Sequence, residues 1–247
     1  MSRRKKSHQS HGSPSRPRLW GKHAVAAALD NPDRKILRAW ATRDAAAFMQ
    51  FPKDLPVTLA EAPDLARLVP HDAPHQGVVI EVEALEDAWL DELVQDAAER
   101  AVLLVLDQVT DPHNVGAILR STAAFGAVGI VTQDRHSPPE SGAVAKAASG
   151  ALELVPWVRV VNLARALEEI GEAGFWRIGL VGDADIDLKH ALGPARIALV
   201  LGAEGAGLRP NTREHCDALA RLPITGAVES LNVSNAAAVA LYAATVA

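Results

Sequence analysis

The chain has 247 residues and a formal net charge of −5; 49% of its residues are apolar and 22% are charged. This is the composition of a globular protein large enough for one large or two modest domains. It has no run of eighteen apolar residues and no signal-peptide core after its basic start, and its single cysteine, Cys216, cannot form an internal disulfide, so we expect a cytoplasmic protein without a membrane span.

Residues 1–18 form a basic tail rich in Ser, Pro and Gly. The tail carries six Lys and Arg and no acid, which leaves 19 basic and 30 acidic residues in the remainder. Such a segment is expected to be disordered. It is equally consistent with an arm that contacts nucleic-acid phosphates and with a solubilising tail.

From residue 19 the pattern becomes globular. The segments 21–31 and 45–51 read as helices, and 34–42 and 77–85 read as strands. They predict a small α/β domain over 19–85. The acidic stretch 86–100 is expected to be a linker or a short helix before a second domain over 101–247.

Apolar runs and helical patterns alternate after residue 100. We expect strands at 101–106, 128–132, 154–160, 176–181 and 197–201, and helices near 114–125, 139–150, 162–173, 211–220 and 231–246. This alternation predicts an α/β fold whose open parallel sheet is covered by helices on both faces. Ordinary connection rules favour an unknotted chain.

The first polar junction follows the strand that ends in this domain at residue 106. Asp111 and Pro112 suit a helix start, and Gly116 and Arg120 are spaced to share one helix face. Arg120 is unusual in so apolar a helix, although a packed stem with a solvated head would explain it. The glycine patterns that cradle phosphates are missing here.

The second junction is LGAEGAGL, residues 201–208. Its glycines, among them Gly202, permit a close approach of the backbone to a ligand, and Glu204 adds one charge. A tight turn that leads into a helix would need the same glycines.

The third junction is the stretch 222–244. Ser230, Asn232, Ser234 and Asn235 gather at the start of an Ala-rich helix, where one of them would suffice as a cap. The additional polar residues indicate contacts beyond capping.

The motifs NVGAILR (114–120), LGAEGAGL (201–208) and SLNVSNA (230–236) resemble the three motifs of the SpoU (TrmH-type) RNA ribose 2′-O-methyltransferases of the SPOUT superfamily. The resemblance covers 104–247 and, more weakly, 19–83. There, LWGKHAVAAAL and HQGVVIEV resemble the L30e-like substrate-binding domain of the two-domain members that methylate a guanosine ribose in 23S rRNA.

This resemblance implies features that composition does not show. The C-terminal sheet would contain a deep trefoil knot, against the expectation from connection rules. S-adenosyl-L-methionine (SAM) would bind in that knot, and the protein would be a homodimer with its sites near the subunit interface.

The resemblance also assigns residues by position. Gly202, Leu222 and Leu231 would bind SAM, largely through backbone, and the polar active-site positions hold Asn114, Arg120, Glu204, Ser230 and Asn232. Two departures stand out. Residues 222–226 read LPITG where many relatives have IPMxG, and the chain ends at Ala247, early for the last helix, which leaves the strength of the dimer open.

The implied reaction is in-line attack of a ribose 2′-oxygen on a sulfonium methyl group. It needs no metal, and no cluster with metal-ligand spacing is present. His113, next to Asn114, is of a residue type often used as a base, but the resemblance points to Arg120, and a guanidinium is a poor proton acceptor. We therefore expect Arg120 to hold the RNA phosphate or stabilise the developing alkoxide.

The expected partner is RNA, with 23S rRNA preferred because tRNA-specific relatives usually lack the N-terminal domain. A tRNA ribose methyltransferase and a resistance-type adenosine methyltransferase are the alternatives within the enzyme class. In another class, a non-catalytic RNA-binding ribosome-assembly factor would keep the fold without the activity.

Overall fold

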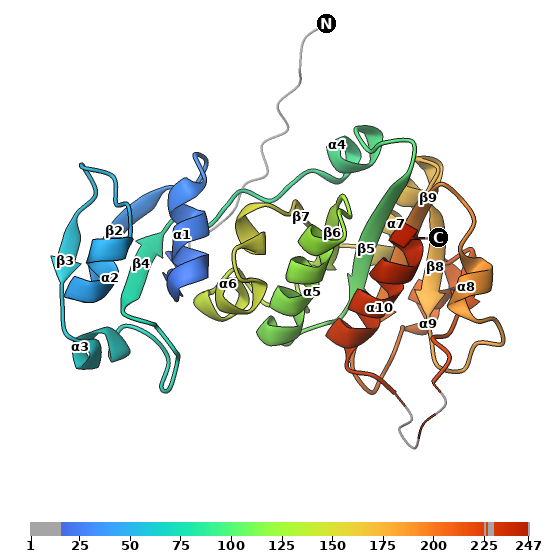
Figure 1. Ribbon diagram of the computed structural model, residues 1–247. Coiled ribbons are helices and arrows are strands. Elements are labelled where there is room, and N and C mark those ends of the chain that lie inside the picture. The colour runs from blue at the N-terminus through green and yellow to red at the C-terminus, as the bar shows by residue number, and fades with distance from the viewer. Residues whose placement is uncertain (1–15, 225, 227–229, 247) are drawn as a thin grey trace, which may run out of the picture.

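A computed structural model describes residues 16–224, 226 and 230–246. Figure 1 shows two sheets, each with its own helices, joined by an extended connection that carries one short helix. The helices nearest the junction are α1 of the first unit and α6 of the second. Across the described ranges, no helix is long and apolar enough to cross a membrane.

The first unit is a mixed four-stranded sheet in the order β1-β4-β2-β3. β4 pairs antiparallel with both β1 and β2, and β3 is parallel to β2. Its elements are β1 (Arg18–Trp20), α1 (Lys22–Asp30), β2 (Ile36–Ala41), α2 (Arg43–Phe48), β3 (Val57–Leu59), α3 (Ala62–Ala66) and β4 (Val78–Val82).

Alternation along the strands divides the side chains of this sheet between two faces. Leu19, Ala39 and Ile80 pack with α1, whereas Trp20 and Val79 pack on the other face with Leu65 of α3 and the partly buried Trp40. The two short strands β1 and β3 and the helix α3 lie outside the predicted elements.

The start of β1 corrects one predicted boundary. Arg18 belongs to the strand and pairs with Glu81, although the composition of 1–18 predicts a segment that does not pack. Pairing with β4 overrides local composition, since the carbonyl of Pro17 also accepts a hydrogen bond from the Val82 N–H. The rest of the predicted tail, residues 1–15, lies outside the described residues.

The second unit is a six-stranded, all-parallel sheet in the order β10-β8-β9-β5-β6-β7. The predicted α/β class with a parallel sheet is confirmed. Its elements, with the connecting helix first, are α4 (Leu90–Gln95), β5 (Ala101–Asp107), α5 (Pro112–Ala124), β6 (Gly129–Gln133), α6 (Gly142–Ala148), η1 (Ala151–Glu153), β7 (Trp157–Val160), α7 (Leu163–Glu172), β8 (Trp176–Leu180), α8 (Leu188–Ala191), β9 (Arg196–Gly202), α9 (Pro210–Glu214), β10 (Ala218–Ala220) and α10 (Val233–Val246).

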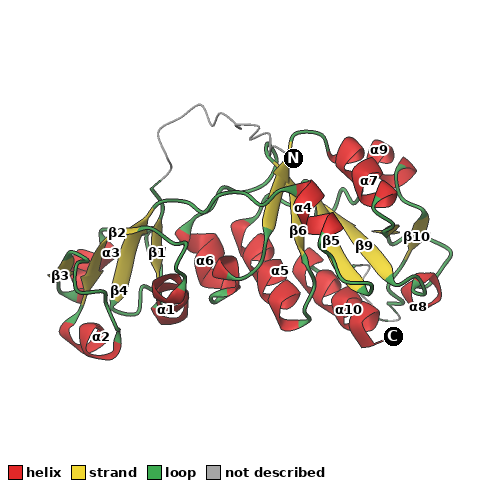
Figure 2. Cartoon of the chain, turned by 90° about the horizontal axis from the view of Figure 1, so that it is seen from above, coloured by secondary structure: helices red, strands yellow, loops and turns green. Residues whose placement is uncertain are grey.

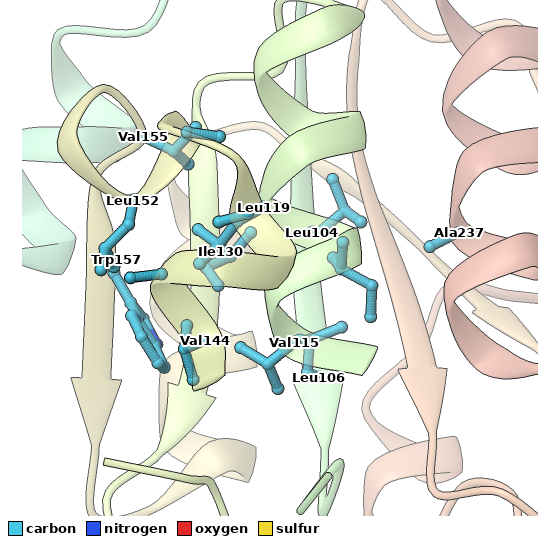
Figure 3. Packing of buried hydrophobic residues seen from close by; sticks show 14 of the residues in the cluster. Leu104, Leu106, Val115, Leu119, Ile130, Val144, Leu152, Val155, Trp157 and Ala237 are labelled. Atoms are coloured by element: carbon cyan, nitrogen blue, oxygen red, sulfur yellow. The ribbon is translucent and has the colours of Figure 1, made fainter. Parts of the chain in front are cut away.

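Both faces of the parallel sheet are buried. On one face, Leu104 and Leu106 pack with α5, α6 and α10, and Figure 3 shows these side chains between the strands and the helices. On the other face, Leu103 and Val105 pack with α4 and α7. The uninterrupted apolar run of β5 reflects this two-sided burial.

The predicted helix over 211–220 is wrong in its second half. The helix α9 ends at Glu214, and Ala218–Ala220 form β10, which pairs parallel with β8. Three strand residues are too few to show a period in the sequence, so pairing with β8 decides their conformation. The predicted strand over 154–160 likewise starts later, at Trp157, after the η1 turn.

A buried ionic cluster joins the two units. The Arg34 guanidinium donates to Glu140 at 2.6 Å and to Glu153 at 2.7 Å, and all three side chains are at least 95% buried. Glu153 also accepts from the Asn31 amide, and Glu140 accepts from the Leu85 N–H. Burial raises the pKa of Glu140, while the Arg34 charge opposes that shift.

Candidate active site

The first predicted junction forms the start of α5. Asp111 caps the helix by accepting from the His113 N–H at 3.0 Å, and Pro112 occupies the first helical position, as predicted. This cap places Asn114 in the first turn, with 8% of its surface exposed. The Asn114 amide therefore lies just beyond the carboxyl end of β5.

Asn232 links all three junctions. Its Nδ2 donates to Asn114 Oδ1 at 2.9 Å and to Glu204 Oε1 at 3.1 Å. Its Oδ1 accepts from the backbone N–H of Ser234 at 2.9 Å and from the Ser234 hydroxyl at 2.6 Å, which caps α10. The side chain thus caps a helix and bridges two other loops at the same time.

The loop after β9 folds back on its own strand. Gly207 donates its N–H to the Ala203 carbonyl at 2.9 Å, and Gly205 and Gly207 adopt positive φ angles of 80° and 65°. A Cβ on Gly202 would lie 2.1 Å from the Gly207 carbonyl carbon, so only glycine fits there. This geometry supports the tight-turn explanation for these glycines and presents Glu204 at the tip of the turn.

An ion pair between the buried Asp107 and the partly exposed Arg209, which sequence reasoning did not assign, holds this loop in place. Asp107, the last residue of β5, is fully buried and accepts from the Arg209 Nε at 2.7 Å and from the Arg209 backbone N–H at 3.1 Å. The signal in the sequence is an acid at the end of an apolar strand. Asp107 thereby joins the ends of β5 and β9 below the Asn232 bridge.

Arg120 lies apart from this cluster. It is exposed and six residues beyond Asn114, which places it about 9 Å further along α5. Within the described ranges, its guanidinium makes no hydrogen bond or ion pair. Among the described residues, Asn114 and Glu204 hydrogen-bond to the Asn232 amide and not to Arg120.

Gly116 serves packing. Its Cβ position would lie 2.5 Å from Ala147 Cβ and 2.6 Å from the Val144 carbonyl oxygen, so it allows α5 and α6 to touch. α6 covers Gly116, whereas Arg120, one turn further along α5, is exposed.

The remaining predicted residues surround the same edge of the sheet. Leu222 is half-buried against the main core, Leu231 is 36% exposed, and Ser230 is exposed. Residues 225 and 227–229, between Leu222 and Ser230, lie outside the described residues. The structure thus brings together Asn114, Glu204 and Asn232 by direct contact.

The single cysteine lies near this region but is not arranged for chemistry. The Cys216 thiol donates to the Thr212 carbonyl oxygen at 3.3 Å. Burial raises the pKa of Cys216 to about 12, so the thiol stays protonated near neutrality.

Comparison with known families covers both sheets. Residues 101–242 match the SpoU rRNA Methylase family, and residues 18–88 match the family described as RNA 2'-O ribose methyltransferase substrate binding. The two matches together include every residue of the Asn114, Glu204 and Asn232 cluster.

Several curated relatives align over nearly the whole chain. The chain is 44% identical over 239 residues to the 23S rRNA (guanosine-2'-O-)-methyltransferase RlmB of Ralstonia nicotianae, covering 92% of this chain and 94% of that protein. It is 39% identical to RlmB of Pseudomonas syringae pv. tomato with the same coverage. A tRNA/rRNA methyltransferase of Synechocystis is 40% identical but longer, and the chain spans 61% of its length.

Solved structures agree on the fold. The SpoU methyltransferase AviRb from Streptomyces viridochromogenes superposes with a TM-score of 0.78 at 24% identity, covering 93% of this chain and 88% of that chain. An rRNA methyltransferase from Sinorhizobium meliloti gives 0.76 at 25% identity, covering 93% and 86%. With both family matches and these relatives, the chain belongs to the SpoU rRNA methylase family.

Proposed function

We propose that this protein is a SAM-dependent RNA methyltransferase that methylates a ribose 2′-hydroxyl of a guanosine in 23S rRNA. The relatives that align over nearly their whole length bear this activity in their names. The observation that carries the proposal is the Asn232 side chain, which fastens the three family motifs into one polar cluster.

The residues at the sheet edge fit the cofactor. Ile224 is 37% and Leu231 36% exposed, which offers apolar surface for an adenine ring, and the outward sides of Gly205 and Gly207 are open. AviRb has been solved in complex with AdoMet. Gly202, Leu222 and Leu231 would hold SAM here, and the bound cofactor supplies an electrophilic methyl group.

The polar residues align the ribose and assist its deprotonation. Asn114, Glu204 and Asn232 form a fixed set of donors and acceptors for the sugar, and Ser230 lies at the entrance of the same loop. Arg120 holds the RNA phosphate or stabilises the negative charge that develops on the 2′-oxygen. Alignment supplies a large part of the rate, since it replaces the entropy of an encounter.

The activity needs no metal, because a sulfonium methyl group is already electrophilic. In the part of the chain that the structure describes, no group of three or more His, Cys, Asp or Glu side chains is arranged to hold a metal ion. RNA and SAM are the expected binding partners, and the cytoplasm, where rRNA is modified, is the expected location.

We assign a trefoil knot to the C-terminal domain, 101–247, and an L30e-like fold to the substrate-binding domain, 19–85. Residues 86–100 form the linker between them, and 1–18 form a basic tail that joins β1.

Strand order supports the knot. β10 lies outside β8, yet the next helix, α10, packs on α5, β5 and β9, so the chain has to return past two strands.

A homodimer that packs through α10 and α5 completes the proposal. α10 carries no charged residue, and Leu231, Val239, Tyr242 and Val246, at its start and along it, are 36–64% exposed. Figures 1 and 2 show α10 beside α5, the helix that bears Arg120. A second copy on this surface would bring Arg120 into the interface.

Methyl transfer tests the function. Radiolabelled SAM is incubated with separate 23S rRNA and tRNA pools from cells that lack the gene, with wild-type protein, Arg120→Ala and the exposed control Arg165→Ala. Label in 23S rRNA that resists alkaline cleavage at its site and disappears only with Arg120→Ala is the expected result. Label confined to tRNA would establish the tRNA alternative. If neither pool nor assembling ribosomal particles take up label, the protein is not an RNA methyltransferase.

A further inference from the structure

The face of the first sheet opposite α1 carries two ordered rows of side chains. Arg18, Glu81 and Arg38 lie side by side across β1, β4 and β2, and Trp20, Val79 and Trp40 form the next row. Alternation along three strands places all six on the same face. α3 covers this face only in part, since Arg18 and Arg38 keep 38% and 52% of their side chains exposed.

The two guanidinium groups are held in fixed positions. The Arg38 Nη2 donates to both oxygens of Glu81, at 3.0 and 3.1 Å, and Arg18 Nε lies 3.6 Å from the same carboxylate. Both guanidinium groups lie over the Trp40 ring, 5.6 Å from its centroid for Arg18 and 5.1 Å for Arg38. Arg18 also donates to the Leu68 carbonyl oxygen at 3.0 Å.

One carboxylate, that of Glu81, pairs with two guanidinium groups in this row. Glu81 is 6% exposed, and its single negative charge is shared by two positive guanidinium groups with exposed edges. The row therefore keeps a net positive charge toward solvent in a protein whose net charge is −5. Held by Trp40 and Glu81, the two arginines lose little freedom when they bind a further group.

This face leads into a groove between the two units. The groove, of about 480 Å³, is lined on one side by Arg16, Arg18 and Trp20 and on the other by Glu140, Ser141 and Gly142. Glu140 is turned toward Arg34 and the Leu85 N–H. Trp20 is 94% buried beneath the groove, and its indole N–H finds no acceptor among the described residues.

The first described residue of the chain, Arg16, lies at this groove. Arg16 lines it, and Arg3, Arg4, Lys5 and Lys6 precede Arg16 in the chain. Fully extended, the connection from Arg3 to Arg16 is at most about 45 Å long. Four further positive charges are thus tethered to the groove.

We infer that the Arg18–Arg38 row and the interdomain groove form an RNA-binding surface separate from the catalytic loops. Unpaired bases of the substrate stack on the exposed guanidinium planes, and phosphates pair with Arg16, Arg18 and Arg38. Arginine planes and edges make both kinds of contact with RNA. Trp40 and Glu81 are positioning residues for the arginines. The inference rests on the proposed function only for the identity of the RNA.

Binding of an unmodified 23S rRNA transcript tests this surface. The double variant Arg18→Gln/Arg38→Gln is compared with Arg43→Gln/Arg165→Gln, a control that removes the same charge from exposed positions on α2 and α7. If each guanidinium contacts a phosphate, the double variant binds about 10-fold or more weakly and flattens the log–log salt slope by roughly 1.4 to 1.8. KM for the RNA rises while kcat stays unchanged.

Two further variants keep the test decisive if the double variant folds poorly. Pro70→Glu adds an acid at an exposed groove position without removing a contact, and it should also weaken RNA binding. Arg38→Lys keeps the positive charge but loses the planar guanidinium group. It should therefore show the wild-type salt slope but bind RNA more weakly than wild type.

The inference is wrong if the double variant and its control bind the RNA with the same affinity and salt slope and Pro70→Glu binds it like wild type. In that case methyl transfer by wild-type protein would leave the proposed function intact. If the variants show the expected differences in RNA binding but wild-type protein methylates no RNA, the proposed methyltransferase activity is wrong and the RNA-binding surface stands.

Discussion

At the scale of single residues, Asn232 makes four hydrogen bonds with one side chain. Only an amide can do this, because the bridge needs two donors on Nδ2 while the helix cap needs an acceptor. A carboxylate of the same shape would keep the cap and lose the bridge.

Asn232→Asp should therefore separate the two roles. The cap on Ser234 remains, but both bridging hydrogen bonds are lost and a second carboxylate faces Glu204. We expect kcat/KM for methyl transfer to fall by about 10-fold or more, since hydrogen bonds to charged groups contribute about 1.5–3 kcal/mol. Asn235→Asp, exposed on the same helix, is the matched control. Unchanged kcat/KM in Asn232→Asp would show that the bridge has no role in catalysis.

Cys216 provides a pH-dependent prediction. Burial raises its pKa to about 12, so at pH 8 the native thiol should react with Ellman's reagent roughly 10³-fold more slowly than in urea. The native state holds this proton more tightly than the unfolded state. Its contribution to stability is therefore complete below about pH 9 and is lost as the pH rises toward 12. Rapid labelling of native protein at pH 8 would contradict the burial.

At the scale of elements, the Arg34 cluster fixes η1 and the loop before α6 against the first unit. Removing one partner of a buried ion pair leaves the others without compensation, and two buried carboxylates depend on Arg34. The neighbouring pair Lys35–Glu83 has the same charges at the surface, with 66% of the Lys35 side chain exposed.

Arg34→Met should lower the free energy of unfolding by about 3–5 kcal/mol, whereas Lys35→Met should change it by at most about 1 kcal/mol. Urea denaturation of both variants checks the difference. Equal effects would mean that water reaches Glu140 and Glu153 and that the cluster does not hold the units together.

Helices and strands with a clear hydrophobic period in the sequence were predictable, whereas short strands whose conformation depends on pairing with a distant strand were not. The run 101–106 and the pattern near 114–125 correspond to β5 and α5, because burial on both faces of a sheet and a capped amphipathic start leave local signals. β1, β3 and β10 have three residues each, too few for a period. Their conformation depends on strands distant in the sequence.

The same contrast holds at the site. Asn114, Glu204 and Asn232 stood out as polar residues after strands, and their family motifs predicted a shared site. The Asp107–Arg209 pair joins residues 102 positions apart, and no local pattern connects them. The packing role of Gly116 was not predictable either, because a glycine in a helix has no local explanation until α6 is seen against it.

At the scale of the whole molecule, the exposed apolar side of α10 has a consequence for assembly. Val239 and Tyr242 are 48% and 57% exposed on a helix with no charge. Sedimentation velocity should show a dimer for wild-type protein and a monomer for Val239→Glu/Tyr242→Glu, because burying two carboxylates in an apolar interface is unfavourable. Ile186→Glu, 47% exposed elsewhere, should leave the dimer intact. A monomeric wild type would rule out the α10 interface.

The position of β9 between β8 and β5 governs when the sheet can close. β5 is complete at Asp107, but its partner β9 begins 89 residues later, at Arg196. At 5–20 residues per second, a ribosome needs roughly 4–18 seconds to synthesise that interval. Throughout it, one edge of a strand that is apolar from Ala101 to Leu106 has no partner, and such an edge readily pairs with other chains. The yield of native protein should therefore depend on chaperones and temperature during synthesis far more than the stability of the finished molecule does.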